Sequence, residues 1–351
     1  MRNLTVEYLR VVFISFIVLL HILWINYGGL RVALNDNTPN TYIQLGLTNL
    51  VSLGVTGFIL ISGYYGVKLK VNRIMSLWMQ TTIYALLSVV TIWVFGEDCA
   101  KTSVWQSEFL QSGGGGTFKG LIDASLSLFD GWWFVADYVI LMLMSPFLNA
   151  GLERISRKAL MFIILMLSFM MYGVWWFHAK DGSMPLLLFF NTYLVGRYIR
   201  LYPVLWLEKY KYLIFFLGLL ILVSEPMALH SVGLDNKMKF VGGNFNVLVL
   251  VVDIALLLIC NAYQKMGKGN IFTRNVLAVY LIHESGIGNR VLHKQLFHEG
   301  VEFNIAYILC VVMAVVVVCI IIEEIRKQLF NKLESWAVTK VDSLLKVSFE
   351  K

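Results

Sequence analysis

Charged residues are scarce in this chain. Asp, Glu, Lys and Arg make up 15% of its 351 residues, hydrophobic residues make up 58%, and the mean hydropathy is +0.71. A water-soluble domain of this length would carry more charge. The composition therefore excludes a soluble enzyme and predicts an all-α, polytopic membrane protein with one membrane domain.

Several motifs of soluble enzymes and secreted domains are also missing. The six histidines and four cysteines form no cluster with metal-ligand spacing, so we expect no metal site and no disulfide framework. No G-x-S-x-G nucleophile elbow occurs, and no internal repeat or low-complexity tract is visible. No A-x-A site follows the first apolar run, and Glu7 precedes it where a signal peptide needs positive charge, so we do not expect its cleavage.

Long apolar runs are what the sequence has instead. Their lengths predict about ten transmembrane helices. We place them near residues 9–27, 43–65, 74–95, 132–149, 159–178, 184–200, 212–229, 243–263, 275–292 and 303–323. The longest loop, residues 96–131, holds Cys99 and four consecutive glycines. We expect it on the outer side, either as a flexible flap over the outer mouth or as a plain linker.

The distribution of positive charge predicts the orientation. With the N-terminus inside, 20 of the 29 Lys and Arg residues lie in cytoplasmic segments and 8 in outer segments. Each cytoplasmic loop carries more of them than its outer neighbours, which is the positive-inside rule. We therefore expect both termini to be cytoplasmic. Because the net charge of +7 follows from this topology, we do not expect nucleic acid as a partner.

The apolar pattern changes after residue 325. Residues 326–351 alternate apolar and polar positions at helical spacing, which predicts a cytoplasmic amphipathic helix on the lipid surface. We therefore divide the chain into a transmembrane domain, residues 1–325, and an amphipathic tail, residues 326–351.

Ionisable residues inside the first apolar run are the strongest functional signal. Arg10 and His21 are eleven residues apart, so in a helix their side chains share one face, about 16 Å apart along the axis. Glu7 lies one turn earlier on nearly the same face. Because a charge in lipid costs free energy, this stripe predicts a polar path into the membrane. The alternatives are a histidine that makes a structural helix–helix hydrogen bond, and an arginine that reaches the lipid–water interface.

Further ionisable residues lie in later apolar runs. His283 and Glu284 occupy the ninth run, and Asp137 occupies the fourth. Each either lines a path for a substrate or belongs to a structural pair, such as His283 with Asp137 or Asp253.

Other polar and aromatic positions have simpler interpretations. Ser62, next to Gly63, predicts close helix packing in preference to a nucleophile. Trp132 and Trp133 predict an aromatic belt at the membrane interface. The four remaining histidines are expected to be solvated at outer ends or in loops: His178, His230, His293 and His298.

Several segments together resemble one family. The chain opens with E-x-x-R, then ten residues and a histidine, and continues with GVTGFILISGYYG at 54–66, GWWFVADYVILMLMSPFLN at 131–149 and AVYLIHES at 278–285. In this order, with Arg73 at the start of the third run, they resemble the acyltransferase-3 family of bacterial membrane-bound acyltransferases over nearly the whole chain. Gly57 departs from the family pattern, in which an aromatic residue is usual, and is expected to thin the packing around the second run.

The resemblance implies an integral membrane O-acyltransferase. Such an enzyme moves an acyl group, most often acetyl, from cytoplasmic acyl-CoA to a hydroxyl of a surface carbohydrate or its lipid-linked precursor. His21 would be the general base, because a neutral imidazole with an ordinary pKa of about 6.5 can take the hydroxyl proton. Arg10 would hold the phosphates of the donor, and Glu7 would pair with Arg10 or orient it.

The resemblance also suggests additional contacts and a location. Arg73 is a second candidate for a donor phosphate, and its alternative is a plain positive-inside charge. The residues expected to line a path are Asp137, His283, Glu284 and Trp133. We expect acetyl-CoA as the donor, no permanently bound cofactor, and a place in the bacterial inner membrane, in contact with lipid.

A different class of function remains open at this stage. In a transporter or flippase for a lipid-linked sugar, the same ionisable residues would gate a path without doing chemistry. An inverted repeat would favour transport, and none is visible in the sequence.

Overall fold

The structure, a computed structural model, describes residues 2–30, 37–95, 132–173, 185–238, 242–244, 246–298 and 301–345. Cys99, the glycine run and His178 lie outside the described residues. The chain divides into two compact units. Unit 1 comprises Met1–Val67, Phe147–Arg274 and Phe303–Leu309, and unit 2 comprises Lys68–Pro146, Asn275–Glu302 and Cys310–Lys351.

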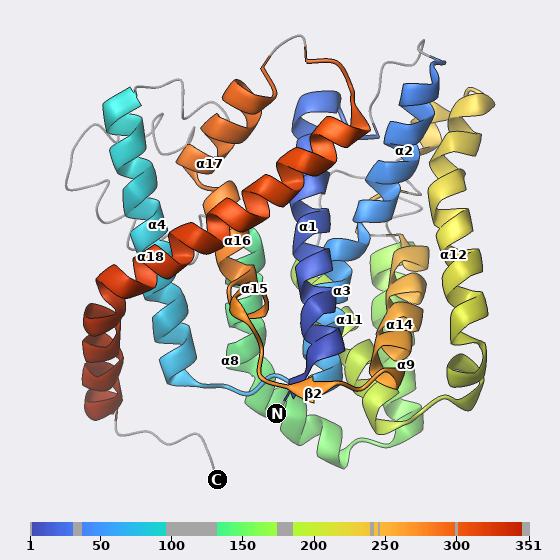
Figure 1. Cartoon of the computed structure of the whole chain (residues 1–351). Helices are drawn as coiled ribbons and strands as arrows, with labels where there is room; N and C mark the ends of the chain where they lie inside the picture. Colours follow the sequence, from blue (N-terminus) through green and yellow to red (C-terminus); the bar gives the residue numbers. More distant parts are fainter. Residues whose placement is uncertain are drawn as a thin grey trace. The chain divides into compact units, whose positions relative to one another are not determined.

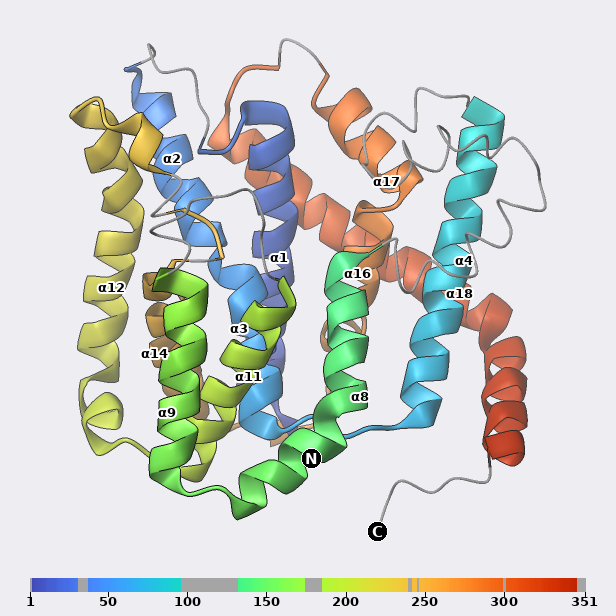
Figure 2. The same ribbon diagram turned by 180° about the vertical axis from the view of Figure 1, so that it is seen from behind.

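Unit 1 is built almost entirely from helices. Its elements are β1 (Arg2–Asn3), α1 (Leu4–Tyr27), α2 (Pro39–Val51), α3 (Leu53–Tyr65), α9 (Arg157–Ser168), the π-helix η2 (Phe169–Gly173), α11 (Pro185–Leu201), α12 (Leu205–Ser231), the 3-10 helix η3 (Asp235–Lys237), α14 (Val247–Ala262), β2 (Met266–Gly267) and α15 (Ile271–Arg274). Strands β1 and β2 form a short antiparallel pair. Figures 1 and 2 show α1, α3, α12 and α14 running alongside one another.

The ends of α1 have local signals. At its start, the Asn3 side chain accepts a hydrogen bond from the Thr5 backbone N–H. At its end, Gly28 has a left-handed backbone with φ of 73°, a conformation that glycine adopts at little cost. The helix between them carries Glu7, Arg10 and His21 without interruption, so the predicted stripe lies on regular α-helix.

The contact between α1 and α3 depends on small residues. A Cβ atom at Gly57 would lie 2.3 Å from the Phe13 ring, and one at Gly54 would lie 2.8 Å from the Phe13 carbonyl oxygen. The Phe13 ring also packs on Phe58, with 6.1 Å between ring centroids. The expectation of thin packing at Gly57 is therefore wrong, because the Phe13 ring fills the space beside the glycine.

A second close helix contact joins α3 to α11. A Cβ at Gly63 would lie 2.3 Å from the Tyr193 carbonyl oxygen, and one at Gly196 would lie 2.6 Å from the Leu60 carbonyl oxygen. The Ser62 hydroxyl donates to the Phe58 carbonyl at 3.0 Å, one turn back in its own helix. These contacts agree with the prediction that the segment serves helix packing.

Unit 2 is also helical. Its elements are α4 (Val71–Phe95), most of α8 (Trp133–Arg154), α16 (Val276–His283), α17 (Gly286–Arg290), the π-helix η4 (Val291–Leu296) and most of α18 (Ile305–Leu345). Helix α18 continues through the predicted boundary at residue 325, and Figure 1 shows its last part turned at an angle. The tail also exposes large apolar side chains, as a helix on a lipid surface does: Leu329, Leu333 and Trp336.

The ninth predicted run is interrupted, which corrects the expectation of a continuous helix over 275–292. Helix α16 ends at His283, and the Ser285 side chain caps α17 by accepting from the Gly288 N–H. A Cβ at Gly288 would lie 2.1 Å from the Ile282 carbonyl oxygen, so only glycine allows this close approach. The interruption places His283 and Glu284 where the backbone leaves regular helix. In membrane proteins, helices are broken where the backbone is buried inside the protein or lines a water-filled cavity.

Five described helices are long and apolar enough to cross a membrane: Leu4–Tyr27, Pro39–Tyr65, Trp133–Arg154, Leu205–Ser231 and Ile305–Val341. Each of the ten predicted runs overlaps a described helix. The α-helical class is confirmed, and the number of ten membrane crossings stays a prediction.

Three aromatic or imidazole side chains are more buried than expected. His230 is buried, its Nδ1 lies 2.5 Å from the Asp235 carboxylate, and the Tyr42 ring packs against it. His293 is buried within η4. Trp132 is buried as well, whereas Trp133 is exposed as an interfacial residue should be. The expectation of solvated side chains holds for His298.

Candidate functional site

Three of the predicted site residues lie on α1 in unit 1. Arg10 donates from Nη1 to Oε1 of Glu7 at 3.2 Å. The Glu7 side chain is 9% exposed and that of Arg10 is 28% exposed, so the pair lies partly inside the protein. His21, nearly three turns further along the helix, is half-buried. The ion pair confirms the expected partnership of Glu7 with Arg10, and it leaves most of the arginine's donors for another group.

Two consecutive tyrosines end α3, and the second of them interacts with Arg10. The Tyr65 hydroxyl is within electrostatic range of both the Arg10 and the Arg200 guanidinium groups. It donates to the Asn261 side-chain oxygen at 2.8 Å. The Tyr64 hydroxyl accepts from Arg200 Nη1 at 3.3 Å, and the Arg200 guanidinium lies 5.2 Å from the Tyr64 ring centroid. We call Arg10, Tyr64, Tyr65 and Arg200 the arginine–tyrosine cluster.

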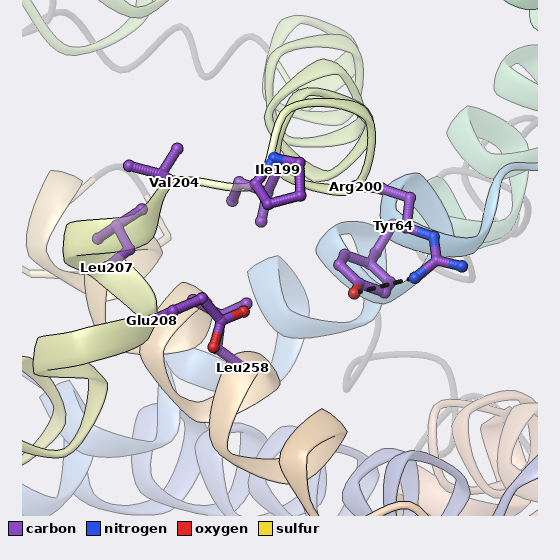
Figure 3. A pocket seen from close by; sticks show the side chains of 8 residues that line it. Tyr64, Ile199, Arg200, Val204, Leu207, Glu208 and Leu258 are labelled. Atoms are coloured by element: carbon purple, nitrogen blue, oxygen red, sulfur yellow. Dashed lines mark hydrogen bonds between the residues drawn. The ribbon is translucent and has the colours of Figure 1, made fainter.

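A small cavity adjoins this cluster. It measures about 60 Å³ and lies between the end of α11, the start of α12 and α14. Figure 3 shows Arg200 and Tyr64 joined by their hydrogen bond on one side, with Glu208 and Leu207 on the other. The walls combine apolar side chains with one cation, Arg200, one carboxylate, Glu208, and one phenol, Tyr64. A cavity with these polar groups suits one part of a polar ligand better than it suits a dry packing defect.

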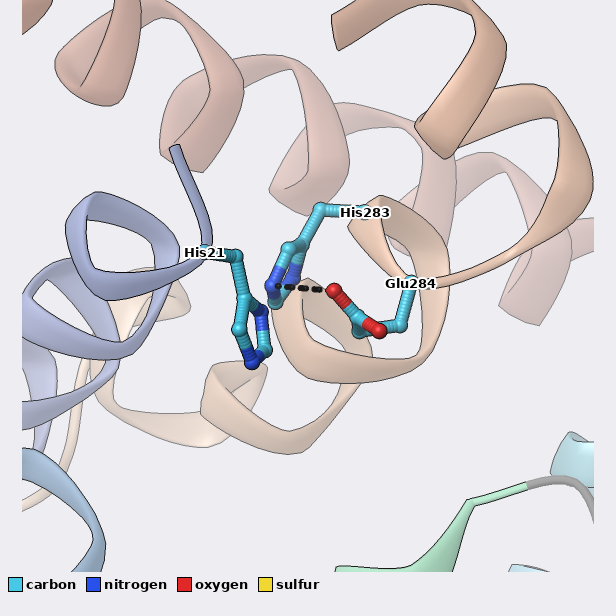
Figure 4. Close-up of side chains that lie close together, drawn as sticks. All are labelled: His21, His283 and Glu284. Atoms are coloured by element: carbon cyan, nitrogen blue, oxygen red, sulfur yellow. Dashed lines mark ion pairs between the residues drawn. The ribbon is translucent and has the colours of Figure 1, made fainter. Parts of the chain in front are cut away.

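The second group of predicted residues lies in unit 2. His283 is buried, and its Nδ1–H donates to the Val279 carbonyl at 2.6 Å. This hydrogen bond turns Nε2 toward the Glu284 carboxylate, 3.6 Å away (Figure 4). The Tyr280 ring packs against His283 at 6.0 Å between centroids, and Phe134 packs on Tyr280. At 3.6 Å the two groups form an ion pair when the imidazole is protonated, and the separation is longer than a hydrogen bond along which a proton is transferred.

The remaining predicted residues of unit 2 differ in exposure and in their neighbours. Asp137 is half-buried on α8, within electrostatic range of Tyr280. Trp133, at the start of α8, is exposed and stacks edge-on against Phe134. Arg73 is exposed in the first turn of α4. The structure therefore brings Asp137, Glu284 and the Tyr280 hydroxyl into one region of unit 2.

Asp253 lies in unit 1, on α14. Its side chain is fully buried, and neither carboxylate oxygen has a hydrogen-bond partner among the described residues. The suggested pair of His283 with Asp253 stays a prediction. The carboxylate oxygens face the Thr56 hydroxyl, which is also buried.

Sequence reasoning missed Arg200 and the two tyrosines. Arg200 was counted only as one of the basic residues of a predicted cytoplasmic loop. A weak sequence signal was present, because Tyr64–Tyr65 ends the second predicted run and Arg200 ends the sixth, so both are predicted on the same side of the membrane. Arginine stacks on aromatic faces more readily than lysine does, so tyrosines and an arginine on one side are a hint of a shared surface. The tyrosines near Arg200 in the sequence, Tyr198 and Tyr202, pack on Arg157 instead.

The chain matches the model of one protein family, described as an acyltransferase domain, over residues 3–324. No curated protein and no solved structure matches it. The match covers both units and nearly every helix, including the E-x-x-R and histidine of α1. Together with the apolar helices, this shows a membrane acyltransferase that belongs to the acyltransferase-3 family.

Proposed function

We propose that this protein transfers an acetyl group from cytoplasmic acetyl-CoA to a hydroxyl of a surface carbohydrate or of its lipid-linked precursor. The observation that carries the proposal is the arrangement on α1. One regular helix holds a partly buried arginine, positioned by Glu7, and a half-buried histidine about 16 Å further along the same face. An extended pantetheine arm bridges a distance of this order between the donor's phosphates and its thioester.

The chemical step follows from these positions. The acceptor hydroxyl oxygen attacks the thioester carbonyl carbon while His21 takes the hydroxyl proton. The tetrahedral intermediate then collapses, the carbon–sulfur bond breaks, and His21 returns the proton to the leaving CoA sulfur. The products are an O-acetyl ester and free CoA, with no net gain or loss of protons.

Arg10 acts before the chemical step. Its planar guanidinium can hold a phosphate through two parallel N–H donors while a third donor stays on Glu7. Glu7 thereby fixes the rotamer of Arg10 and is a positioning residue. Arg73 is a second candidate for a donor phosphate, and Asp137, His283, Glu284 and Trp133 are candidates for lining a substrate path in unit 2.

The proposed topology places the protein in the inner membrane with both termini in the cytoplasm. The bias of Lys and Arg toward the predicted inner segments supports it. Labelling of Cys99 in intact cells by a membrane-impermeant thiol reagent is expected. Labelling of Cys99 only after lysis would contradict the orientation, and a variant that replaces Cys260, Cys310 and Cys319 by serine keeps the readout specific to that one thiol.

The test of the proposed function is a titration of acetyl-CoA into detergent-purified protein. Arg10→Ala should weaken binding by about tenfold to a hundredfold, because a hydrogen bond to a charged group contributes roughly 1.5–3 kcal/mol. Arg10→Lys should recover only part of the loss, since lysine lacks the planar fork. Arg154→Ala, which removes an exposed arginine on α8, is the matched control and should bind normally.

The transporter or flippase alternative predicts a different outcome. A carrier of a lipid-linked sugar needs no CoA, so folded wild-type protein that binds no acetyl-CoA would contradict the acyltransferase donor proposed here. The family match favours the enzyme, and no described contact favours transport.

A further inference from the structure

We propose that Arg200 and Tyr64, with the small cavity beside them, bind the ribose 3′-phosphate of acyl-CoA. This inference rests on the proposed function, because it assigns one more group of the same donor. It gives Arg200 a binding role that the sequence pattern did not suggest.

The first support is the state of the Arg200 guanidinium. Its side chain is exposed, and among the described residues it forms no ion pair. Its hydrogen bond goes to the neutral Tyr64 hydroxyl, and the same ring supports the face of the guanidinium. The Tyr64 contacts hold the arginine in one orientation while its charge stays uncompensated, as a site for a phosphate requires.

The second support is the presence of another arginine near Arg200 in the same unit. Tyr65, which follows Tyr64 at the end of α3, interacts electrostatically with both the Arg10 and the Arg200 guanidinium groups. Two arginines that share one tyrosine neighbour offer separate positions for the two phosphate groups of one ligand. Acyl-CoA has such a pair, a pyrophosphate and a ribose 3′-phosphate on the same nucleotide. Arg10 shares its face of α1 with His21, so the pyrophosphate, from which the pantetheine arm leaves, belongs with Arg10, and the 3′-phosphate belongs with Arg200.

The third support is the size of the cavity. At about 60 Å³ it is far below the roughly 300–1,000 Å³ that encloses a whole small-molecule ligand. It therefore takes only one end of a larger molecule, and the rest of the ligand lies outside it. Five of its eight lining residues are apolar, among them Ile199, Val204 and Leu258.

Glu208 is the feature of the cavity that opposes an anion. Its carboxylate lines the same space and would repel a phosphate. However, Lys211 Nζ lies 3.1 Å from the Glu208 carboxylate and offsets its charge. Because the Glu208 carboxylate is itself exposed to solvent and paired with Lys211, its repulsion of a phosphate bound by Arg200 is screened.

The experiment compares two donors that differ only in this phosphate. Acetyl-CoA and acetyl-dephospho-CoA, which lacks the 3′-phosphate, are titrated into the full-length protein in lipid nanodiscs. Wild type should bind acetyl-CoA about tenfold to a hundredfold more tightly than the dephospho form. In Arg200→Gln this preference should disappear, while the affinity for the dephospho form stays unchanged. Arg154→Gln is the matched control and should keep the preference.

The remaining outcomes separate a failure of the 3′-phosphate assignment from a failure of the proposed function. If wild type binds acetyl-CoA but Arg200→Gln weakens both donors equally, or neither, the 3′-phosphate assignment is wrong and the proposed function stands. If wild type binds neither donor, the proposed function fails together with the inference.

A phospholipid headgroup is the other source of a phosphate near this cavity. Native mass spectrometry of the same variants, from nanodiscs with and without anionic phospholipid, separates the two sources. Loss of a retained lipid in Arg200→Gln, with the preference between the two donors unchanged, assigns the site to lipid and overturns the inference.

Discussion

Arg200 in unit 1 and Arg326 in unit 2 are both arginines at the end of an apolar stretch, yet their surroundings differ. Arg326 is 6% exposed and donates to both oxygens of Glu323, at 2.7 and 3.0 Å, and to Glu334 at 3.3 Å. Arg200 is exposed and donates to one neutral tyrosine. An arginine whose three nitrogens all donate to carboxylates is structural, whereas one with a neutral partner can still bind an anion.

The surroundings of Arg326 form a closed network. Glu323 also accepts from the Tyr84 hydroxyl at 2.6 Å and from Gln80 at 3.2 Å, and the Ser76 hydroxyl donates to Glu334. These bonds tie α18 to α4 within unit 2. They explain why α18 continues past residue 325 and why the first part of the predicted tail packs against another helix.

The comparison shows what charge counting omits. Both arginines contribute equally to the positive-inside bias, and the sequence interpretation treated both as topological charges. Only the identity of the neighbouring acceptors distinguishes a residue that stabilises the fold from one that is available to a ligand.

The largest effect on stability is expected for Arg326→Met. It removes the arginine that donates to both oxygens of the buried Glu323 carboxylate, which costs roughly 3–5 kcal/mol of the free energy of unfolding. Denaturant unfolding in detergent, followed by tryptophan fluorescence, measures this. The control is Lys332→Met, which changes an exposed lysine on the same helix and should cost less than about 0.5 kcal/mol. A loss below 1 kcal/mol for Arg326→Met would show that the network is not structural.

A smaller loss of stability is expected for Gly57→Phe. The new side chain would collide with the Phe13 ring, and overpacking of a well-packed contact typically costs 1–3 kcal/mol. Adding Phe13→Ala to the same chain should restore part of the stability by vacating the space. Gly151→Ala is the control, because nothing lies within 4 Å of a Cβ at that position. Unchanged unfolding of Gly57→Phe would refute the packing of α1 on α3 described above.

The smallest effect on stability is expected for Arg200→Gln. Because its side chain is exposed and has no carboxylate partner among the described residues, the change in unfolding free energy should stay within about 0.5 kcal/mol. A loss comparable to that of Arg326→Met would break the distinction between the two arginines and assign Arg200 a structural role.

The sequence located most of the fold. Each predicted apolar run overlaps a helix in the structure, because the length and hydrophobic periodicity of a helix are local properties of the sequence. The interruption at Glu284–Ser285 was missed, although Ser285 and Gly288 carry its signal, because the apolar residues continue across it. The burial of His230 was missed because its partner, Asp235, lies after the end of α12.

Only the part of the candidate site that lies on the single helix α1 could be predicted from the sequence. Glu7, Arg10 and His21 share a face that follows from residue spacing alone, and the structure confirms the regular helix and the Glu7–Arg10 pair. The addition of Arg200 and Tyr64 required the packing of α3 on α11, because contacts between distant segments depend on tertiary structure and not on local pattern.

The most direct test of the central claim measures acetyl-CoA binding and acetyl transfer on the same preparations of wild type and His21→Ala. Transfer is followed as labelled acetyl entering the carbohydrate fraction of host membranes. The account predicts that His21→Ala binds acetyl-CoA normally and loses at least about a hundredfold in transfer rate, because general-base catalysis contributes that much. His298→Ala, which changes an exposed histidine, should transfer at the wild-type rate. Near-normal transfer by folded His21→Ala would contradict the account.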